Sequence, residues 1–207
     1  MENLEQFYIE TIYPDDAETA SREDLKIARD LIRGIFSRHE YSTSHLEYFD
    51  NSYPETKDGD SLRKFLEHPS YGILYLARKT TNEEIIGVLG IEPFIGSIEE
   101  NNVYLDRLHL AWARTIERYE GRGIQHALFN EFFNDAHRIA ATQTKDGMIS
   151  LTVNLHRQNS LGRLQAALKE FGFEDAKNID SPNKNPLYKD LHNMSRMLVA
   201  ETASDEN

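Results

Sequence analysis

The sequence predicts one α/β domain with a mixed, mostly antiparallel central sheet of about six to seven strands and about four flanking helices. Three observations lead to this fold class. The 207 residues suit a single domain, and 39% of them are apolar, which is enough for a core. Strand-like and helix-like patterns are interspersed along the chain. No repeat or linker rich in Pro, Gly or Ser divides it, so we expect one domain over 1–207, with about 201–207 as a frayed tail.

Periodicity and turn signals define the expected elements. Ser21-Arg22-Glu23-Asp24 is typical of a helix capping box, and the polar run 80–84 separates two strands as a hairpin turn would. The tyrosine-rich segment 40–60 predicts a polar connection. In order, we expect a strand over 7–13, helices over 21–36 and 61–67, strands over 71–78, 85–94 and 103–115, a helix over 124–139, a strand over 148–155, a helix over 159–171, and one or two strands over 187–200.

Composition excludes several classes of protein. The net charge of −12 disfavours binding to nucleic acid, whereas it either favours a cationic substrate or simply keeps the protein soluble. The absence of cysteine excludes disulfides, thiolate metal sites and a cysteine nucleophile. The eight histidines show no metal-ligand spacing such as H-E-x-x-H, so we expect no metal. No apolar run is long enough for a membrane span and no signal peptide is visible, which predicts a cytoplasmic protein.

The most informative segment is the turn Gly121-Arg122-Gly123, which follows a long strand and precedes a helix. Glycines at such a turn permit positive φ and let a ligand approach the backbone. The helix start offers unpaired amides and a positive dipole end, which together suit a pyrophosphate, and Arg118 or Arg122 could add a charge contact. The chain has neither G-x-x-x-x-G-K-[ST] nor G-x-G-x-x-G, so a P-loop or dinucleotide site is not expected. On its own, this turn is equally compatible with helix packing.

These residues resemble the GNAT acetyltransferases, whose turn between the fourth strand and third helix reads [Q/R]-x-x-G-x-[G/A]. Arg118, Gly121 and Gly123 fit it. The later landmarks of the family, a strand, a helix-opening asparagine and a closing Gly-Phe pair, resemble Leu151-Thr152-Val153, Asn159 and Gly172-Phe173. The resemblance extends over nearly the whole chain and implies a GNAT fold.

The resemblance implies a site for acetyl-CoA as co-substrate. The pyrophosphate would contact backbone amides at the turn, and the pantetheine arm would pair with the end of the preceding strand. Asn159 would lie near the pantetheine, although a helix cap explains it equally well. The implied residues are Gly121, Arg122, Gly123, Ile124 and Gln125 for the pyrophosphate, and Arg114, Thr115 and Ile116 for the pantetheine.

The chain departs from the family in its general acid. The tyrosine that commonly protonates the leaving thiolate would fall on Leu168, and Gln125 stands where a small residue is common. The spacing from Asn159 to Gly172 is also longer than usual. Coenzyme binding therefore carries over better than acid catalysis does.

Candidate bases lie on the long strand 103–115. His109 has a suitable unperturbed pKa, and Asp106 could act through a water; each also has a plain structural or surface reading. A regular strand would put Asp106 and His109 on opposite faces, whereas the bulge that family members often carry here would change that parity. His156 is a lesser candidate. Five residues of the 40–60 segment could form a rim for a cationic amine, or an ordinary solvated loop: Tyr41, Tyr48, Asp50, Tyr53 and Glu55.

The function that this pattern predicts is N-acyl transfer from acetyl-CoA to a primary amine, by direct attack in a ternary complex. The acceptor is a small-molecule or peptide amine that the sequence does not identify. Two alternatives stay open: a non-catalytic acyl-CoA-binding regulatory domain of the same fold, and an interaction domain whose turn only packs a helix. Many such domains dimerise through sheet edges, so a homodimer is compatible with the sequence.

Overall fold

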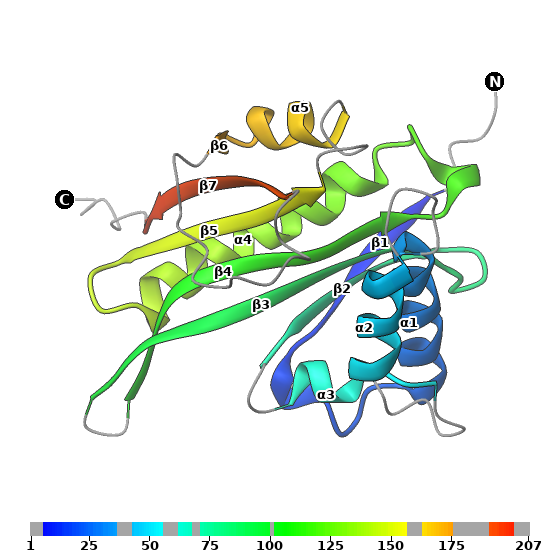
Figure 1. Cartoon of the computed structure of the whole chain (residues 1–207), viewed down its shortest axis with the longest axis horizontal. Helices are drawn as coiled ribbons and strands as arrows, with labels where there is room; N and C mark the ends of the chain where they lie inside the picture. Colours follow the sequence, from blue (N-terminus) through cyan, green and yellow to red (C-terminus); the bar gives the residue numbers. More distant parts are fainter. Residues whose placement is uncertain are drawn as a thin grey trace.

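A computed structural model describes residues 6–36, 43–55, 62–67, 71–99, 102–156, 163–175 and 191–200 (Figure 1). No helix in these ranges is long and apolar enough to cross a membrane. The elements are β1 (Phe7–Ile12), η1 (Pro14–Asp16), α1 (Arg22–Phe36), α2 (Thr43–Ser52), α3 (Arg63–Leu66), β2 (Ile73–Lys79), β3 (Ile85–Glu99), β4 (Asn102–Thr115), η2 (Glu117–Tyr119), α4 (Ile124–Gln143), β5 (Met148–His156), α5 (Arg163–Glu170), β6 (Glu174–Asp175) and β7 (Leu191–Val199).

The strands form one sheet of seven in the order β1-β2-β3-β4-β5-β7-β6. Neighbours are antiparallel except β4 and β5, which run parallel because the whole of α4 connects them. The mixed, mostly antiparallel sheet predicted from the sequence is therefore confirmed. The hairpin of β3 and β4 is longer than predicted on the β3 side, and it projects beyond the helices (Figure 1).

Helices cover both faces of the sheet and create two cores (Figure 1). We call the two sides the α4 face and the α1 face. On the α4 face, Leu128 and Phe132 of α4 pack on strand residues such as Leu108 and Leu110. On the α1 face, a second cluster joins α1, α2 and α3 to β2, β3 and the end of β4: Leu25, Ala28, Ile32, Phe49, Phe65, Leu76, Val88 and Trp112. In the part of the chain that the structure describes, no further helix packs on the α1 face, and the polar residues considered below lie on that face beyond these three helices.

One helix differs from the prediction. Residues 43–52 form α2, although the segment 40–60 was expected to be a polar connection. Its sequence TSHLEYFDNS contains few apolar residues, so helical periodicity was weak. The helix is held from outside: Phe49 is buried against Trp112, with ring centroids 6.1 Å apart, and Asp50 pairs with arginines of α1. Tertiary contacts, rather than local propensity, stabilise α2.

The first helix begins with half of the predicted capping box. The backbone amide of Asp24 donates to Ser21 Oγ at 3.4 Å. The Asp24 carboxylate does not complete the box, because it pairs with Arg78 on β2 at 2.7 Å. This contact fixes α1 to the sheet instead of capping its own helix.

Candidate functional site

The parallel strands β4 and β5 pair over only part of their length. Their register runs from Arg107–Ser150 to Leu110–Val153, whereas β4 continues to Thr115. The end of β4 therefore has a sheet edge that β5 leaves uncovered. Such a diverging strand pair offers backbone donors and acceptors to an extended ligand.

A bulge on β4 marks the point where the strands diverge. Trp112 pairs with Gly90 and Leu110 with Ile91, so Ala111 is the additional residue on β4. Leu110 faces the α4 core, whereas Ala111 and Trp112 both contact the α1 core. The bulge thus reverses the alternation of faces after Ala111.

The predicted pantetheine residues differ in what their backbone offers. The Ile116 amide donates to the Ile86 carbonyl of β3 at 2.9 Å. Because backbone groups point to alternate edges along a strand, those of Arg114 also face β3, and those of Ala113 and Thr115 face the uncovered edge. The Arg114 guanidinium packs against Gly34 of α1, and the Thr115 side chain is buried. Thr115 is therefore the predicted residue whose backbone is best placed for the edge.

The glycine turn has the geometry that its sequence indicates. Gly121 and Gly123 have φ of +76° and +81°, and Gly123 is the N-cap of α4. A Cβ at either position would meet no protein atom within 4 Å, so packing inside the chain does not require glycine there. Helix geometry leaves the amides of Ile124 and Gln125 without intrahelical acceptors. This exposed turn thus combines free approach with amide donors and the positive end of α4.

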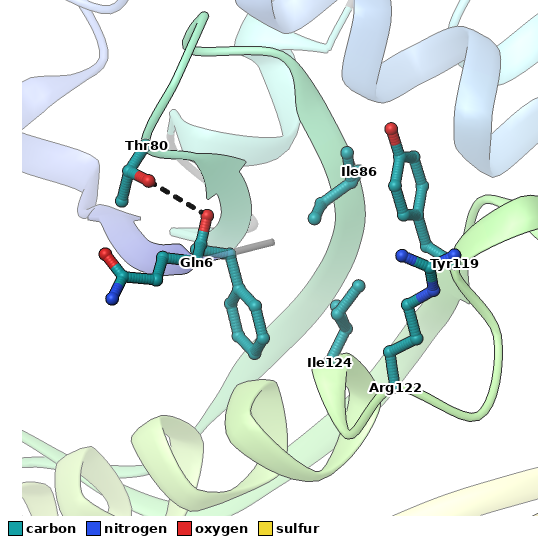
Figure 2. A pocket seen from close by; sticks show the side chains of 7 residues that line it. Gln6, Thr80, Ile86, Tyr119, Arg122 and Ile124 are labelled. Carbon is teal, nitrogen blue, oxygen red and sulfur yellow. Dashed lines mark hydrogen bonds between the residues drawn. The ribbon is translucent and has the colours of Figure 1, made fainter. Parts of the chain in front are cut away.

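Two arginines beside the turn lie on Tyr119. The guanidinium carbons of Arg118 and Arg122 are 5.1 and 5.4 Å from the centre of its ring. Arg118 also pairs with Glu84, and this carboxylate raises the pKa of Arg118. Arg122 and Ile124 border a pocket of about 340 Å³ on the α4 face, which also involves Phe7, Ile86 and Tyr119 (Figure 2). The turn thus has positive charge and open space beside it.

On the α1 face, a row of polar side chains crosses the sheet near the bulge. Glu92 of β3 lies opposite His109 of β4, which lies beside Thr152 of β5. His109 Nδ1 is 3.0 Å from Thr152 Oγ1, a hydrogen bond whose direction depends on the tautomer. Side chains of directly paired residues point to the same face of the sheet, so Glu92 and His109 lie in the same local environment. Glu92 was not among the predicted site residues.

Burial shifts the pKa of both ionisable residues in the row, His109 and Glu92, toward the uncharged form. It lowers the pKa of His109 to about 4, with a further contribution from the Arg107 charge. It also raises the pKa of Glu92 above its usual range. Near neutral pH His109 is therefore uncharged, and Glu92 has a pKa closer to neutrality than a solvated carboxyl.

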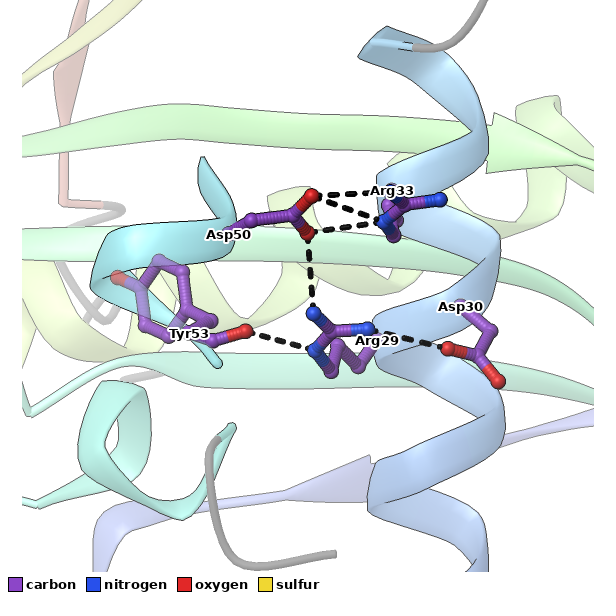
Figure 3. Close-up of polar contacts among 5 residues, drawn as sticks. All are labelled: Arg29, Asp30, Arg33, Asp50 and Tyr53. Carbon is purple, nitrogen blue, oxygen red and sulfur yellow. Dashed lines mark hydrogen bonds and ion pairs between the residues drawn. The ribbon is translucent and has the colours of Figure 1, made fainter. Parts of the chain in front are cut away.

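The end of α2 borders the same region. Tyr53 is half-buried, with its ring 5.4 Å from that of Trp112, and Glu92 contributes to raising the pKa of Tyr53 after burial. The buried Arg29 Nε donates to the Tyr53 carbonyl at 2.7 Å (Figure 3). Asp50 accepts from Arg29 at 3.0 Å and from Arg33 at 2.8 Å. Asp50, predicted as part of an acidic rim, is instead neutralised inside this network, which fixes Tyr53.

Other predicted residues lie elsewhere. Asp106 is exposed on the projecting hairpin, where it borders a different pocket with Lys145 and Asp146. Leu168, where the sequence resemblance predicted the position of the acid tyrosine, is fully buried in the α4 core. Asn159 and Tyr41 lie outside the described residues, and the structure does not describe the His156 side chain. Within the described ranges, no three His, Asp or Glu side chains are grouped as metal ligands would be.

Comparison with solved structures gives the fold a name. No family model and no curated protein sequence matches the chain. A GNAT-family acetyltransferase from Staphylococcus aureus is 16% identical, with TM-score 0.55, over 92% of this chain and 99% of its own. The PaiA N-acetyltransferase of Thermoplasma acidophilum, solved with coenzyme A, is 15% identical, with TM-score 0.56, over 93% and 99%.

An aminoglycoside acetyltransferase from an uncultured soil metagenome is also similar, at 16% identity and TM-score 0.53, over 86% of this chain and 99% of its own. Identities this low establish the shared fold and leave substrate and activity to be argued from the site. The sheet order, the parallel β4–β5 pair and these matches together show that the chain has the fold of the GNAT acetyltransferases.

Proposed function

We propose that this protein is an acyl-CoA-dependent N-acyltransferase that transfers an acetyl group from acetyl-CoA to a primary amine. The observation that carries the proposal is the continuity of two features. The uncovered edge of β4 ends at Thr115, and the chain then enters the Gly121–Gly123 turn at the start of α4. One extended ligand with a pyrophosphate at one end can therefore contact both.

The described residues suit such a ligand. The pyrophosphate would lie on the amides from Gly121 to Gln125, where a Cβ-free turn leaves open space. The pantetheine arm would pair with the backbone near Thr115. The acyl end would then lie beside the Ala111 bulge, next to His109 and Glu92, which the register pairs across β3 and β4. The coenzyme complex of the similar Thermoplasma protein is consistent with this choice of ligand.

The polar row would handle the protons. The acyl group is supplied as a thioester: the amine nitrogen bonds to the acyl carbon, the C–S bond breaks, and the thiolate takes up a proton. A protonated amine and the thioester thus yield an amide, a thiol and one released proton. Glu92 would accept the proton of the ammonium, because its raised pKa suits that role. Neutral His109, held by Thr152, would accept a hydrogen bond from the attacking amine.

The cellular setting follows from this chemistry. Acetyl-CoA is an intracellular metabolite, so we place the enzyme in the cytoplasm, acting on a small-molecule or peptide amine. The similar structures include an acetyltransferase for aminoglycosides, which shows that the fold accepts small-molecule amines.

Melting curves with and without acetyl-CoA test the proposal, with ADP as a control for the pyrophosphate alone. Ligand at about a hundred times its Kd adds about 2.7 kcal/mol, which should raise the Tm by about 5–10 °C for a chain of this length. Release of free thiol on addition of an amine panel then tests turnover. The absence of any Tm shift at millimolar acetyl-CoA would refute coenzyme binding.

The burial of Leu168 in the core favours a second candidate function, acyl-CoA binding without acyl transfer. No acid can act from that position, and a domain that binds acyl-CoA without transferring the acyl group would tolerate this loss. The two functions differ in a single readout: both predict the Tm shift, and only the enzyme predicts amine-dependent thiol release.

A further inference from the structure

Arg107 lies one row along the α1 face from the proposed proton acceptors. The register from Phe94–Arg107 to Glu92–His109 is continuous, so both pairs point to the same side of the sheet. On β5, the corresponding neighbours are Ser150 and Thr152. The Arg107 guanidinium carbon is 4.0 Å from the centre of the Phe94 ring. The acceptor side of the site thus has a carboxylate row and a cationic row next to each other.

The charge of Arg107 is not neutralised by any ion pair between described residues. Its Nε is buried and makes no hydrogen bond within the described structure. A buried donor of this kind destabilises the fold unless a partner satisfies it. Three other arginines near this side, Arg29, Arg33 and Arg78, pair with aspartate or glutamate. Among the described residues, Arg107 is therefore a cation on the α1 face with no acidic partner and an unsatisfied buried donor.

The surroundings of Arg107 define what could bind it. Phe94 is 36% exposed beside it, and Met197 of β7, which pairs with Ser150, is 62% exposed at the far end of the same row. A guanidinium carries a forked set of N–H donors, which matches the two oxygens of a carboxylate. Adjacent rows on one strand face are about 7 Å apart, and a flexible arginine side chain spans much of that separation.

We propose that Arg107 selects the acceptor: it binds a carboxylate close to the reacting amine, so that the preferred acceptors are α-amino acids rather than polyamines or aminoglycosides. This inference rests on the proposed function, and it assigns the two charged rows to the two charged groups of one acceptor. The ammonium lies at Glu92 and His109, and the carboxylate lies at Arg107. A polycation would instead bring a positive charge against Arg107 without a compensating anion.

The test compares matched acceptors. Each member of a panel of L-amino acids is assayed beside its α-amide and its decarboxylated amine, for instance L-leucine, L-leucinamide and 3-methylbutylamine. The wild-type protein should have the highest kcat/KM for the carboxylate forms of at least one triplet. R107Q should raise KM for that amino acid by about tenfold or more, the effect of losing a charged hydrogen-bond partner, with little change in kcat. It should leave the decarboxylated amine unaffected, because that amine has no group for Arg107.

Two variants serve as controls. R107K keeps the charge but not the forked donor set, so it should recover only part of the affinity for the amino acid. R138Q removes an arginine that is 52% exposed on α4, on the opposite side of the sheet. It should leave the ratios of kcat/KM among the three members of a triplet unchanged. Comparing each variant with wild type on the same acceptor cancels differences in amine reactivity.

The outcomes separate the inference from the proposed function. If acetyl-CoA raises the Tm and amines without a carboxylate react as well as amino acids, the enzyme stands and the role of Arg107 is refuted. An equal effect of R107Q on all three members of a triplet also refutes it, since that indicates a structural role. If acetyl-CoA neither binds nor reacts, both proposals fail together.

Discussion

Glu92 and His109 lie directly opposite each other on β3 and β4, and both are half-buried on the same face of the sheet. Burial raises the pKa of Glu92 and lowers the pKa of His109 to about 4, with Arg107 adding to the second effect. Both shifts favour the uncharged form of each group. The pKa of each group therefore differs between the folded and the unfolded chain. This difference affects the pH dependence of stability as well as the proposed catalysis.

The contributions of His109 and Glu92 to the free energy of unfolding should change with pH in opposite directions. Unfolded His109 binds a proton below about pH 6.5 and folded His109 only below about 4, so its contribution is lost as pH falls through that window. For Glu92 the folded pKa is the higher one, so its contribution is present below about 4.5 and is lost as pH rises. The free energy of unfolding, measured in urea at pH 7, 6 and 5, should depend less steeply on pH in H109Q than in the wild type. In E92Q it should depend more steeply on pH. Unchanged slopes in both variants would show that the pair is solvated.

Removal of the Glu92 carboxylate should impair turnover more than binding. E92Q is expected to lower kcat by about 10²–10⁴, the usual contribution of a general base, and to abolish the acidic limb of the kcat/KM profile. The Tm shift with acetyl-CoA should persist, because the proposed contacts of the coenzyme are backbone groups of the glycine turn and the β4 edge, and Glu92 provides none of them. E99Q, an exposed acid farther along β3, is the matched control and should retain wild-type rates. A wild-type pH profile in E92Q would assign the base elsewhere.

The order of the elements and the glycine turn could be read from the sequence because both are local. Capping residues, period-2 and period-3.6 patterns, and Gly121 and Gly123 act within a few residues of themselves. The family resemblance then arranged these pieces into a fold that the strand order confirms. The helix α2 shows the other side of this rule. Its own sequence is weakly helical, and it was not predicted because its stability comes from contacts with Arg29, Arg33 and Trp112, which are distant in sequence.

The acceptor side could not be read in the same way, because it depends on register between strands. Glu92 and His109 are 17 positions apart in sequence, and only the pairing of β3 with β4 places them together. An isolated acid between Ile91 and Pro93 in an apolar strand was the available signal, and it is a weak one. The bulge at Ala111 decides which side chains accompany His109, and no local pattern fixes its position.

Substitution of Gly123 by alanine should remove coenzyme binding, and Gly147 provides the control. Both residues have positive φ, +81° and +72°, so each substitution should cost about 1–2 kcal/mol of stability through backbone strain. Only Gly123 lies at the start of α4, where strain would displace the amides. G123A should therefore lose the Tm shift with acetyl-CoA, whereas G147A should keep it. Retention of the full shift by G123A would place the pyrophosphate elsewhere.

The contact of α1 with α2 should depend on Asp50. Its pKa is lowered chiefly by hydrogen bonds from Arg33, and it also pairs with Arg29, which is only 4% exposed. D50A leaves that buried guanidinium with less compensation and should destabilise the fold by about 3 kcal/mol in urea unfolding. Asp30 is 55% exposed and also contacts Arg29, so D30A should change stability by at most about 0.5 kcal/mol. Similar losses in the two variants would contradict the geometry of the network.

Glu84 should weaken coenzyme binding by holding Arg118 away from the turn. The carboxylate pairs with Arg118 and is itself a negative charge near the expected pyrophosphate. E84Q is therefore expected to tighten acetyl-CoA binding a few-fold at low salt, measured by titration calorimetry, and R118Q to weaken it by a similar factor. Both effects should diminish in 0.5 M NaCl, since these charges are exposed or half-buried. K145Q, which breaks the exposed pair with Glu99 on the projecting hairpin, should leave the affinity unchanged. Weaker binding by E84Q would show that the carboxylate positions Arg118 for the ligand rather than competing with it.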